Sequence, residues 1–181
     1  MLWSEEIPYY TTADGKTKVK LVAGEIEGVK ALTPAPDSWA AVPENEVAIW
    51  TFTMQPGAEW KLPLASKEAN RSLYFYSGGT ASINGEDIPL ERVAELDASQ
   101  EVILKNGEKE SKFLVLQGKP MNEPVAQYGP FVMNTQQEIQ EAFQEYQRTQ
   151  FGGWPWHKND HVHPRESGRF AKHADGREEY K

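Results

Sequence analysis

Residues 118–135 of this chain carry the sequence GKPMNEPVAQYGPFVMNT, which separates a β-rich body from a single helix. Three prolines and two glycines in this stretch restrict the backbone or require unusual backbone angles. They flank Gln127 and Tyr128, whose polar ends need hydrogen-bonding partners if the side chains are buried. The composition therefore predicts an ordered connector and not a flexible loop.

Short apolar segments alternate with turn signals upstream of this connector. The strongest is VAIWTFTM at residues 47–54, which is rich in β-branched and aromatic side chains. Asn84-Gly85 and Asn106-Gly107 are hairpin signals. Further strands are expected at residues 18–23, 60–64, 72–76, 80–83, 92–96, 101–104 and 113–116. Short strands at this spacing predict a sandwich or barrel.

A helix is predicted immediately downstream of the connector. Thr135 and Glu138 have the spacing of a capping box, and Gly152-Gly153 ends the helical pattern. Apolar side chains recur at helical spacing at four positions: Ile139, Ala142, Phe143 and Tyr146. We expect this face to pack against the outside of the barrel, and a free partner-binding helix is the alternative.

Four segments are therefore expected along the chain. Residues 1–17 are a linker or an edge strand, and residues 18–134 are the barrel. Residues 135–153 are the packed helix, and residues 154–181, where charge, glycine and proline dominate, are an extended C-terminal arm.

Composition excludes several classes of function. The formal net charge of −8 disfavours direct nucleic-acid binding, which would need a local basic patch that the text before the mixed-charge tail lacks. The absence of cysteine removes disulfides, thiolate nucleophiles and iron–sulfur clusters, and suits the reducing cytoplasm, where we expect the protein. No apolar run approaches the roughly 20 residues of a membrane span, and the first ten residues do not form a signal peptide.

The connector closely resembles the NEPVVQYGPFVMNT signature that closes the second barrel of pirin-family proteins. The resemblance extends from VKLVAGE at residues 19–25, through ENEVAIWTFTMQPGAEW at residues 44–60, to GRFAKHADG at residues 168–176. Pirin-family proteins are bicupins, so the resemblance implies an all-β cupin barrel of the double-stranded β-helix or jelly-roll type. It matches the second, usually metal-free barrel and not the N-terminal barrel that holds iron.

The cupin metal motif is altered in this sequence. The family places His-x-His and a Glu after a Pro-Gly turn, because imidazole and carboxylate groups converge there on a metal ion. The corresponding text is PGAEWKLPLASKE at residues 56–68, with four residues that cannot bind metal at the ligand positions: Leu62, Pro63, Leu64 and Ala65. Glu68, beside Lys67 and Arg71, is more simply a solvated surface residue.

No imidazole is available inside the predicted barrel. All the histidines lie beyond the helix: His157, His161, His163 and His173. With Asp160 nearby they could form a metal site in the tail, but ordinary polar residues without a metal are the preferred interpretation. We therefore expect no catalytic, cofactor-binding or metal-binding residues and no cofactor.

Barrel aromatics leave one further alternative open. They could line a ligand cavity, although filling of the core is the preferred interpretation: Trp50, Phe52, Trp60, Tyr74 and Tyr76.

Two functions are compatible with the resemblance. The first is a metal-free cupin module with a structural or protein-interaction role and no chemistry of its own. The alternative is half of a pirin-type quercetin 2,3-dioxygenase, active only with an N-terminal iron-binding cupin. The family's dioxygenase and redox-sensitive transcription-cofactor roles belong to the iron barrel. Met1 could be an internal methionine or the start of a half-length protein, and both readings stay open.

The resemblance also implies a partner. The two barrels of the family pack face to face, so a single C-terminal barrel should expose an apolar face. We expect a homodimer, or association with the missing N-terminal half, with residues 1–10 and 154–180 reaching across to the neighbour. Neither a membrane nor nucleic acid is expected as a direct partner.

Overall fold

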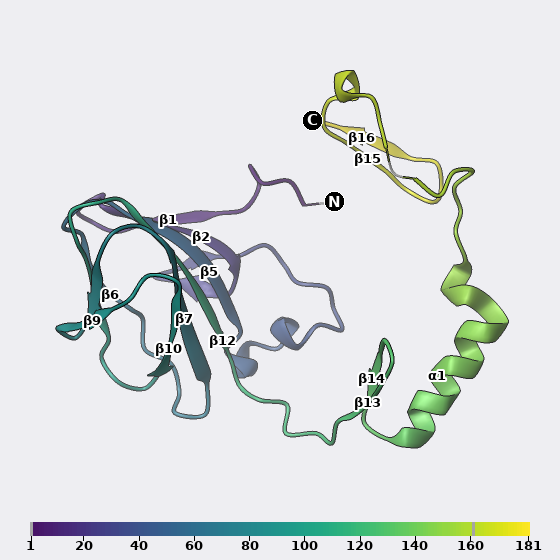
Figure 1. Ribbon diagram of the computed structural model, residues 1–181, viewed down its shortest axis with the longest axis horizontal. Coiled ribbons are helices and arrows are strands. Elements are labelled where there is room, and N and C mark those ends of the chain that lie inside the picture. Colours follow the sequence, from purple (N-terminus) through teal and green to yellow (C-terminus); the bar gives the residue numbers. More distant parts are fainter. Residues whose placement is uncertain (1, 161) are drawn as a thin grey trace. The chain divides into compact units, whose positions relative to one another are not determined.

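The computed structural model describes residues 2–160 and 162–181. Its contacts divide the chain into two compact units, Leu2–Met121 and Asn122–Lys181, both drawn in Figure 1. Met1 and His161 lie outside the described residues. No helix within the described ranges is both long enough and apolar enough to cross a membrane.

The first unit is built from two antiparallel sheets (Figure 1). The six-stranded sheet has the order β1 (Tyr9–Thr11), β2 (Thr17–Ala23), β5 (Ala48–Met54), β12 (Ser111–Gly118), β7 (Asn70–Ser77), β10 (Arg92–Asp97). The four-stranded sheet has the order β6 (Glu59–Lys61), β11 (Ile103–Asn106), β8 (Ala81–Ile83), β9 (Glu86–Ile88). A strand lies in each of the expected regions, and within residues 1–17 the segment Tyr9–Thr11 forms an edge strand of this sheet.

Short elements close one end of the first unit. β3 (Glu25–Ile26) and β4 (Val29–Lys30) form a small hairpin, followed by the 3-10 turns η1 (Trp39–Ala41) and η2 (Pro43–Asn45). The backbone of Glu46 then takes the left-handed conformation before β5 begins. Residues of these elements line a pocket.

A row of aromatic rings joins the two sheets. Phe113 of β12 stacks between Phe75 of β7 at 4.8 Å and Phe52 of β5 at 5.2 Å, measured between ring centroids. Phe52 meets the edge of Trp60 of β6 at 5.0 Å. Trp50 is buried in the same cluster, so the prediction that Trp50, Phe52 and Trp60 fill the barrel is confirmed.

Two of the five predicted core aromatics lie on the other face. Successive side chains of a strand point to opposite sides, and β7 directs Arg71, Leu73 and Phe75 inward. Tyr74 is therefore only partly buried, and Tyr76 is 49% exposed on the outer face. The prediction that these two tyrosines face the barrel interior is wrong.

The two Asn-Gly signals have different outcomes. Asn84 and Gly85 both have positive φ, 50° and 87°, in a two-residue hairpin turn between β8 and β9, as predicted. Asn106 instead ends β11 as a buried residue. Its amide donates to the carbonyls of Met54, Gln55 and Lys109 at 2.8–3.0 Å, so it holds two loops together.

The connector folds as a hairpin that belongs to the second unit. β13 (Ala126–Tyr128) pairs with β14 (Phe131–Met133), and α1 (Gln136–Thr149) follows, then the 3-10 turn η3 (Gln150–Gly152). The boundary at Met121 therefore places residues 122–134 with the helix and not with the barrel. The predicted connector is ordered, but the predicted barrel boundary at residue 134 lies too far along the chain.

The helix begins and packs as its sequence indicates. Thr135 Oγ1 accepts from the Glu138 amide at 3.2 Å, and Glu138 Oε2 accepts from the Thr135 amide at 2.7 Å, which confirms the capping box. Phe143 on the apolar face contacts Phe131 at 4.8 Å and Tyr128 at 5.7 Å, centroid to centroid. The hairpin thus covers part of this face, and packing of the helix on the barrel stays a prediction.

The C-terminal tail is not extended throughout. After the 3-10 turn η4 (Arg165–Ser167), β15 (Phe170–Lys172) pairs with β16 (Glu178–Tyr180). Phe170 stacks on Tyr180 at 5.8 Å, and Gly176 takes a φ of +87° in the turn. The expectation of an extended arm is wrong for these residues, because one aromatic pair and one turn suffice to close a local hairpin.

Replacing the buried amide of Asn106 tests its role in the barrel. Asn106→Ala leaves three carbonyls without this donor and is expected to lower the free energy of unfolding by about 1–3 kcal/mol. Urea unfolding followed by tryptophan fluorescence measures the change. Glu108→Ala, an exposed residue of the same loop, is the control and should change stability by less than about 0.5 kcal/mol. Equal stability of both variants would contradict the assignment.

A polar pocket at one end of the barrel

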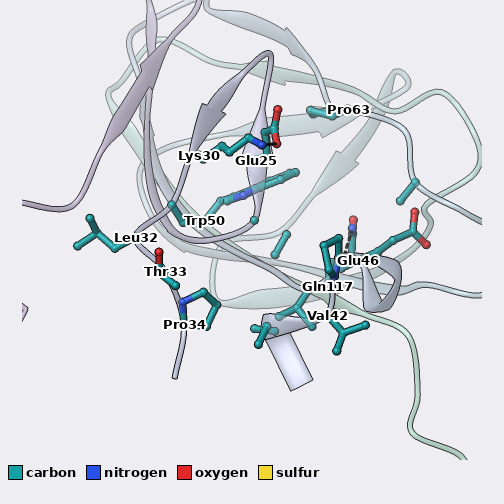
Figure 2. Close-up of a pocket in the computed structure, with 18 of the residues that line it drawn as sticks. Glu25, Lys30, Leu32, Thr33, Pro34, Val42, Glu46, Trp50, Pro63 and Gln117 are labelled. Carbon is teal, nitrogen blue, oxygen red and sulfur yellow. Dashed lines mark hydrogen bonds and ion pairs between the residues drawn. The ribbon is translucent and has the colours of Figure 1, made fainter. Parts of the chain in front are cut away.

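A pocket of about 470 Å³ opens at one end of the six-stranded sheet. Its floor contains Ala48, Arg71 and Gln117, which stand next to one another because Gln117 of β12 is opposite Ala48 of β5 and Arg71 of β7. Trp50, two residues after Ala48 on β5, also lines the pocket and is the next inward-facing side chain of that strand. Figure 2 shows Trp50 between the segment carrying Leu32, Thr33 and Pro34 and the side carrying Glu46 and Gln117.

Arg71 is the central polar group of this pocket. Its side chain is buried, and the residue is only 1% exposed. Nε and Nη2 donate to Gln117 Oε1 at 2.7 and 2.5 Å, and Nη2 also donates to the Pro63 carbonyl at 2.7 Å. Burial lowers the pKa of the Arg71 guanidinium, while the charge of Glu46 acts in the opposite direction. An arginine stays protonated under these conditions, so the pocket holds a buried cation.

Glu46 holds one wall of the pocket in place. Its carboxylate accepts from the Ser66 amide at 3.0 Å and from the Ser66 hydroxyl, and it pairs with Lys119 at 3.3 Å. The hydrogen bond from the Ser66 side chain is the main reason that the pKa of Glu46 is lowered. The Glu46 carbonyl accepts from Gln117 Nε2 at 2.9 Å. Gln117 therefore connects Arg71 to this wall.

Two buried donors in the pocket lining have no hydrogen-bond partner among the described residues. They are Nη1 of Arg71 and Nε1 of Trp50. Buried donors are almost always paired in native proteins, and an unpaired one costs about 1–3 kcal/mol. Two unpaired buried donors in one pocket are thus an unusual feature.

The segment that corresponds to the cupin metal motif lines part of the same pocket, but it supplies no metal-binding side chain. Leu62 is buried in the core, whereas Pro63, Leu64 and Ala65 line the pocket. Glu68 is exposed, as expected for a surface residue. Arg71, three residues after Glu68, is buried, and the sequence analysis assigned it no role in a site. The alternation of Arg71 with Leu73 and Phe75 was the signal that could have shown its inward direction.

Comparison with known proteins now places the chain in a family. Residues 49–152 match the model of the pirin C-terminal cupin domain. This chain belongs to the pirin family. It is 33% identical to pirin of Rattus norvegicus over 156 residues, which is 83% of this chain and 50% of pirin. It is 38% identical to a pirin-like protein of Solanum lycopersicum over 99 residues, 53% of this chain and 34% of that protein.

A solved structure gives the same fold. The crystal structure of quercetin 2,3-dioxygenase from Acinetobacter baumannii matches 84% of this chain and 50% of that chain, with a TM-score of 0.68 and 27% identity. The predicted cupin fold and the pirin resemblance are therefore confirmed. The chain spans about half the length of the relatives it matches.

The iron implied by the pirin family does not fit the residues of this barrel. A family site needs imidazole and carboxylate donors converging from adjacent strands. Here the motif positions carry leucine, proline and alanine, and the nearest ionised group of the pocket floor is the cation Arg71. A guanidinium has no lone pair to offer a metal ion and repels it.

The tail histidines are used in other ways within the described residues. The ring of His163 meets the edge of Phe170 at 4.7 Å, and His173 Nε2 lies 2.9 Å from Glu179 Oε1. His161 lies outside the described residues. In residues 2–160 and 162–181 no group of three metal-binding side chains converges. The expected absence of a metal site stays a prediction.

Elemental analysis tests that prediction. Protein purified without a tag, incubated with iron(II) and desalted is expected to retain no stoichiometric transition metal, because the barrel offers no imidazole. A variant with every histidine replaced by alanine (His157, His161, His163 and His173) is the control for weak tail binding. Stoichiometric iron in that variant would show a metal site that the side chains of the barrel do not explain.

Proposed function

We propose that this pirin-family chain is a metal-free cupin module with a structural or protein-interaction role and no chemistry of its own. The observation that carries the proposal is the replacement of the metal motif by Leu62, Pro63, Leu64 and Ala65 beside the buried cation Arg71. The motif positions offer no ligand for a redox metal, and the barrel sequence supplies neither a thiol nor a histidine base, which supports a role without chemistry. The lack of cysteine supports a cytoplasmic location.

The outer face of the six-stranded sheet supports a role in association. Its neighbouring strands place Val93, Tyr74 and Leu114 in one cross-strand row. Tyr76, Val93 and Leu116 are 49%, 48% and 37% exposed. An apolar patch of this kind on a sheet is typical of an interaction surface.

A second barrel is the partner that this face fits best. The matched region makes up half of each of these relatives, so each has room for one more domain of the size of that region. Domain interfaces of that kind cover on the order of 600–1,500 Å², enough for association between separate chains. The proposed assembly is a homodimer in which a second copy covers the outer face, with residues 1–10 and 154–180 reaching across.

Sedimentation equilibrium at micromolar concentration tests the homodimer. The wild-type chain of 20.5 kDa is expected to sediment at twice that mass. Leu116→Glu would bury an unpaired carboxylate in the interface and should raise the dimer dissociation constant at least about 100-fold. Val125→Glu introduces the same charge at an exposed residue outside the six-stranded sheet and should leave the dimer intact. A concentration-independent monomer, or an undisturbed Leu116→Glu dimer, would remove the proposal.

The second candidate is half of a pirin-type quercetin 2,3-dioxygenase that works only with an N-terminal iron-binding cupin. It is favoured by the half-length match to the quercetin 2,3-dioxygenase structure. In this arrangement the present barrel would support the iron barrel without touching the metal.

Quercetin turnover separates the two functions. This chain alone, supplied with iron(II), is expected to show no turnover above free iron. The second measurement adds a separately produced N-terminal barrel from a pirin relative. Turnover that exceeds that of the added barrel alone by tenfold or more would favour the second function, and unchanged turnover would favour the first. Turnover by this chain alone would contradict both.

A further inference from the structure

The pocket at the end of the barrel contains a buried cation, Arg71, that forms no direct ion pair with a carboxylate in the described part of the chain. Among the charged groups that line it, Glu25 pairs with Lys30 at 3.4 Å and Glu46 pairs with Lys119 at 3.3 Å. Arg71 has no ion pair with a carboxylate among the described residues, and its hydrogen bonds go to neutral oxygens of Gln117 and Pro63. A buried cation with only neutral partners is costly, and an anion relieves the cost.

The unpaired donors indicate what kind of anion fits. Arg71 Nη1 and Trp50 Nε1 are both buried, both lack a partner within the described part of the chain, and both residues line this pocket. A carboxylate offers two oxygens that accept several hydrogen bonds, and arginine is the side chain best suited to bind it. A carboxylate bound in this pocket would supply acceptors for the donors that the protein leaves unpaired.

The remaining walls favour an organic molecule over an inorganic ion. Leu32, Pro34, Val42 and Leu64 supply apolar surface around the polar floor, and Figure 2 shows Leu32 and Pro34 across the pocket from Gln117. The volume of about 470 Å³ lies in the range of small-molecule sites, which combine apolar walls with a few fixed polar groups. A phosphate ion would leave the walls uncovered and carry more charge than Arg71 neutralises.

We propose that this pocket binds a small organic monocarboxylate, with the carboxylate on Arg71 and Trp50 and the apolar body between Leu32, Pro34 and Leu64. Gln117 is a positioning residue, because its Oε1 fixes two nitrogens of the guanidinium and leaves Nη1 for the ligand. The site needs neither a metal nor a second barrel. The inference therefore stands apart from the proposed structural role.

Benzoate is a suitable probe, with benzamide as its neutral analogue of the same shape. Titration of each into the full chain, followed by the indole N–H signals in two-dimensional NMR, reports directly on Trp50. Benzoate is expected to saturate with a Kd of about 1 mM or lower and to shift the Trp50 indole signal. Benzamide, which lacks the charge, should bind at least about tenfold more weakly.

Two variants localise the binding. Trp50→Phe removes the indole donor, keeps an aromatic ring in the core, and should weaken benzoate binding about tenfold; the smaller ring is expected to lower Tm, so binding is measured on protein shown to be folded. Its missing indole signal also assigns the Trp50 resonance. Gln117→Glu places a carboxylate beside Arg71, so it should abolish benzoate binding, although the Glu46 carbonyl loses its donor. Gln100→Glu, the same change on an exposed turn, is the matched control and should bind as the wild type does.

Several outcomes would overturn the proposal. Equal binding of benzoate and benzamide would mean an apolar pocket without a carboxylate site. Inorganic phosphate that displaces benzoate at equal concentration would mean a general anion site. Absence of a saturable shift in the folded wild type would mean that the pocket binds no carboxylate. Undiminished binding to a folded Gln117→Glu variant would place the site elsewhere.

Discussion

The stack of rings from Phe75 through Phe113 and Phe52 to Trp60 is the contact on which the rest of the barrel depends. It crosses three strands of one sheet and reaches the other sheet, with centroid separations of 4.8, 5.2 and 5.0 Å. Ring pairs in these offset and edge arrangements add to the free energy of burying their area. The stack fills the middle of the barrel with buried rings, and the pocket lies beyond it, at the end that carries Ala48, Arg71 and Gln117.

That end is set by the registers of β5, β7 and β12. Two residues beyond the ring stack come Trp50, Val115 and Leu73, and two residues further come Ala48, Gln117 and Arg71, opposite one another. Each row follows from the period of two in a strand. The small side chain of Ala48 leaves room at this level, and the polar pair fixes the shape of that room. One alternating pattern thus produces both the solid core and the polar pocket above it.

Local sequence signals predicted most of the fold. VAIWTFTM gave a correct strand because aromatic and β-branched residues favour a half-buried pleated surface. The capping box and the Asn84-Gly85 turn depend only on neighbouring residues, so they were also predictable. The tail hairpin was missed because its contacts, Phe170 with Tyr180 and Lys172 with Glu178, join short polar segments that carry no strand pattern of their own.

The candidate site could not be found in the same way. Arg71 is a charged residue among polar ones, and charged side chains are rarely buried, so the surface was the natural expectation. Its burial depends on Gln117, which is 46 positions further along the chain. Tyr74 and Tyr76 were misplaced because aromatic composition was followed in place of the alternation of Arg71, Leu73 and Phe75. The alternation offers two opposite directions for β7, and the pairing with β12 decides between them.

Adjacent residues of β12 serve the two faces of one sheet. Leu116 contributes to the exposed outer face, and Gln117 points inward to the pocket, because the strand alternates. A partner that covers Leu116 therefore does not fill the space beside Gln117. The proposed association through the outer face and the proposed binding in the pocket would therefore use opposite sides of the same strand. Neither surface needs a metal ligand at Leu62, Pro63, Leu64 or Ala65.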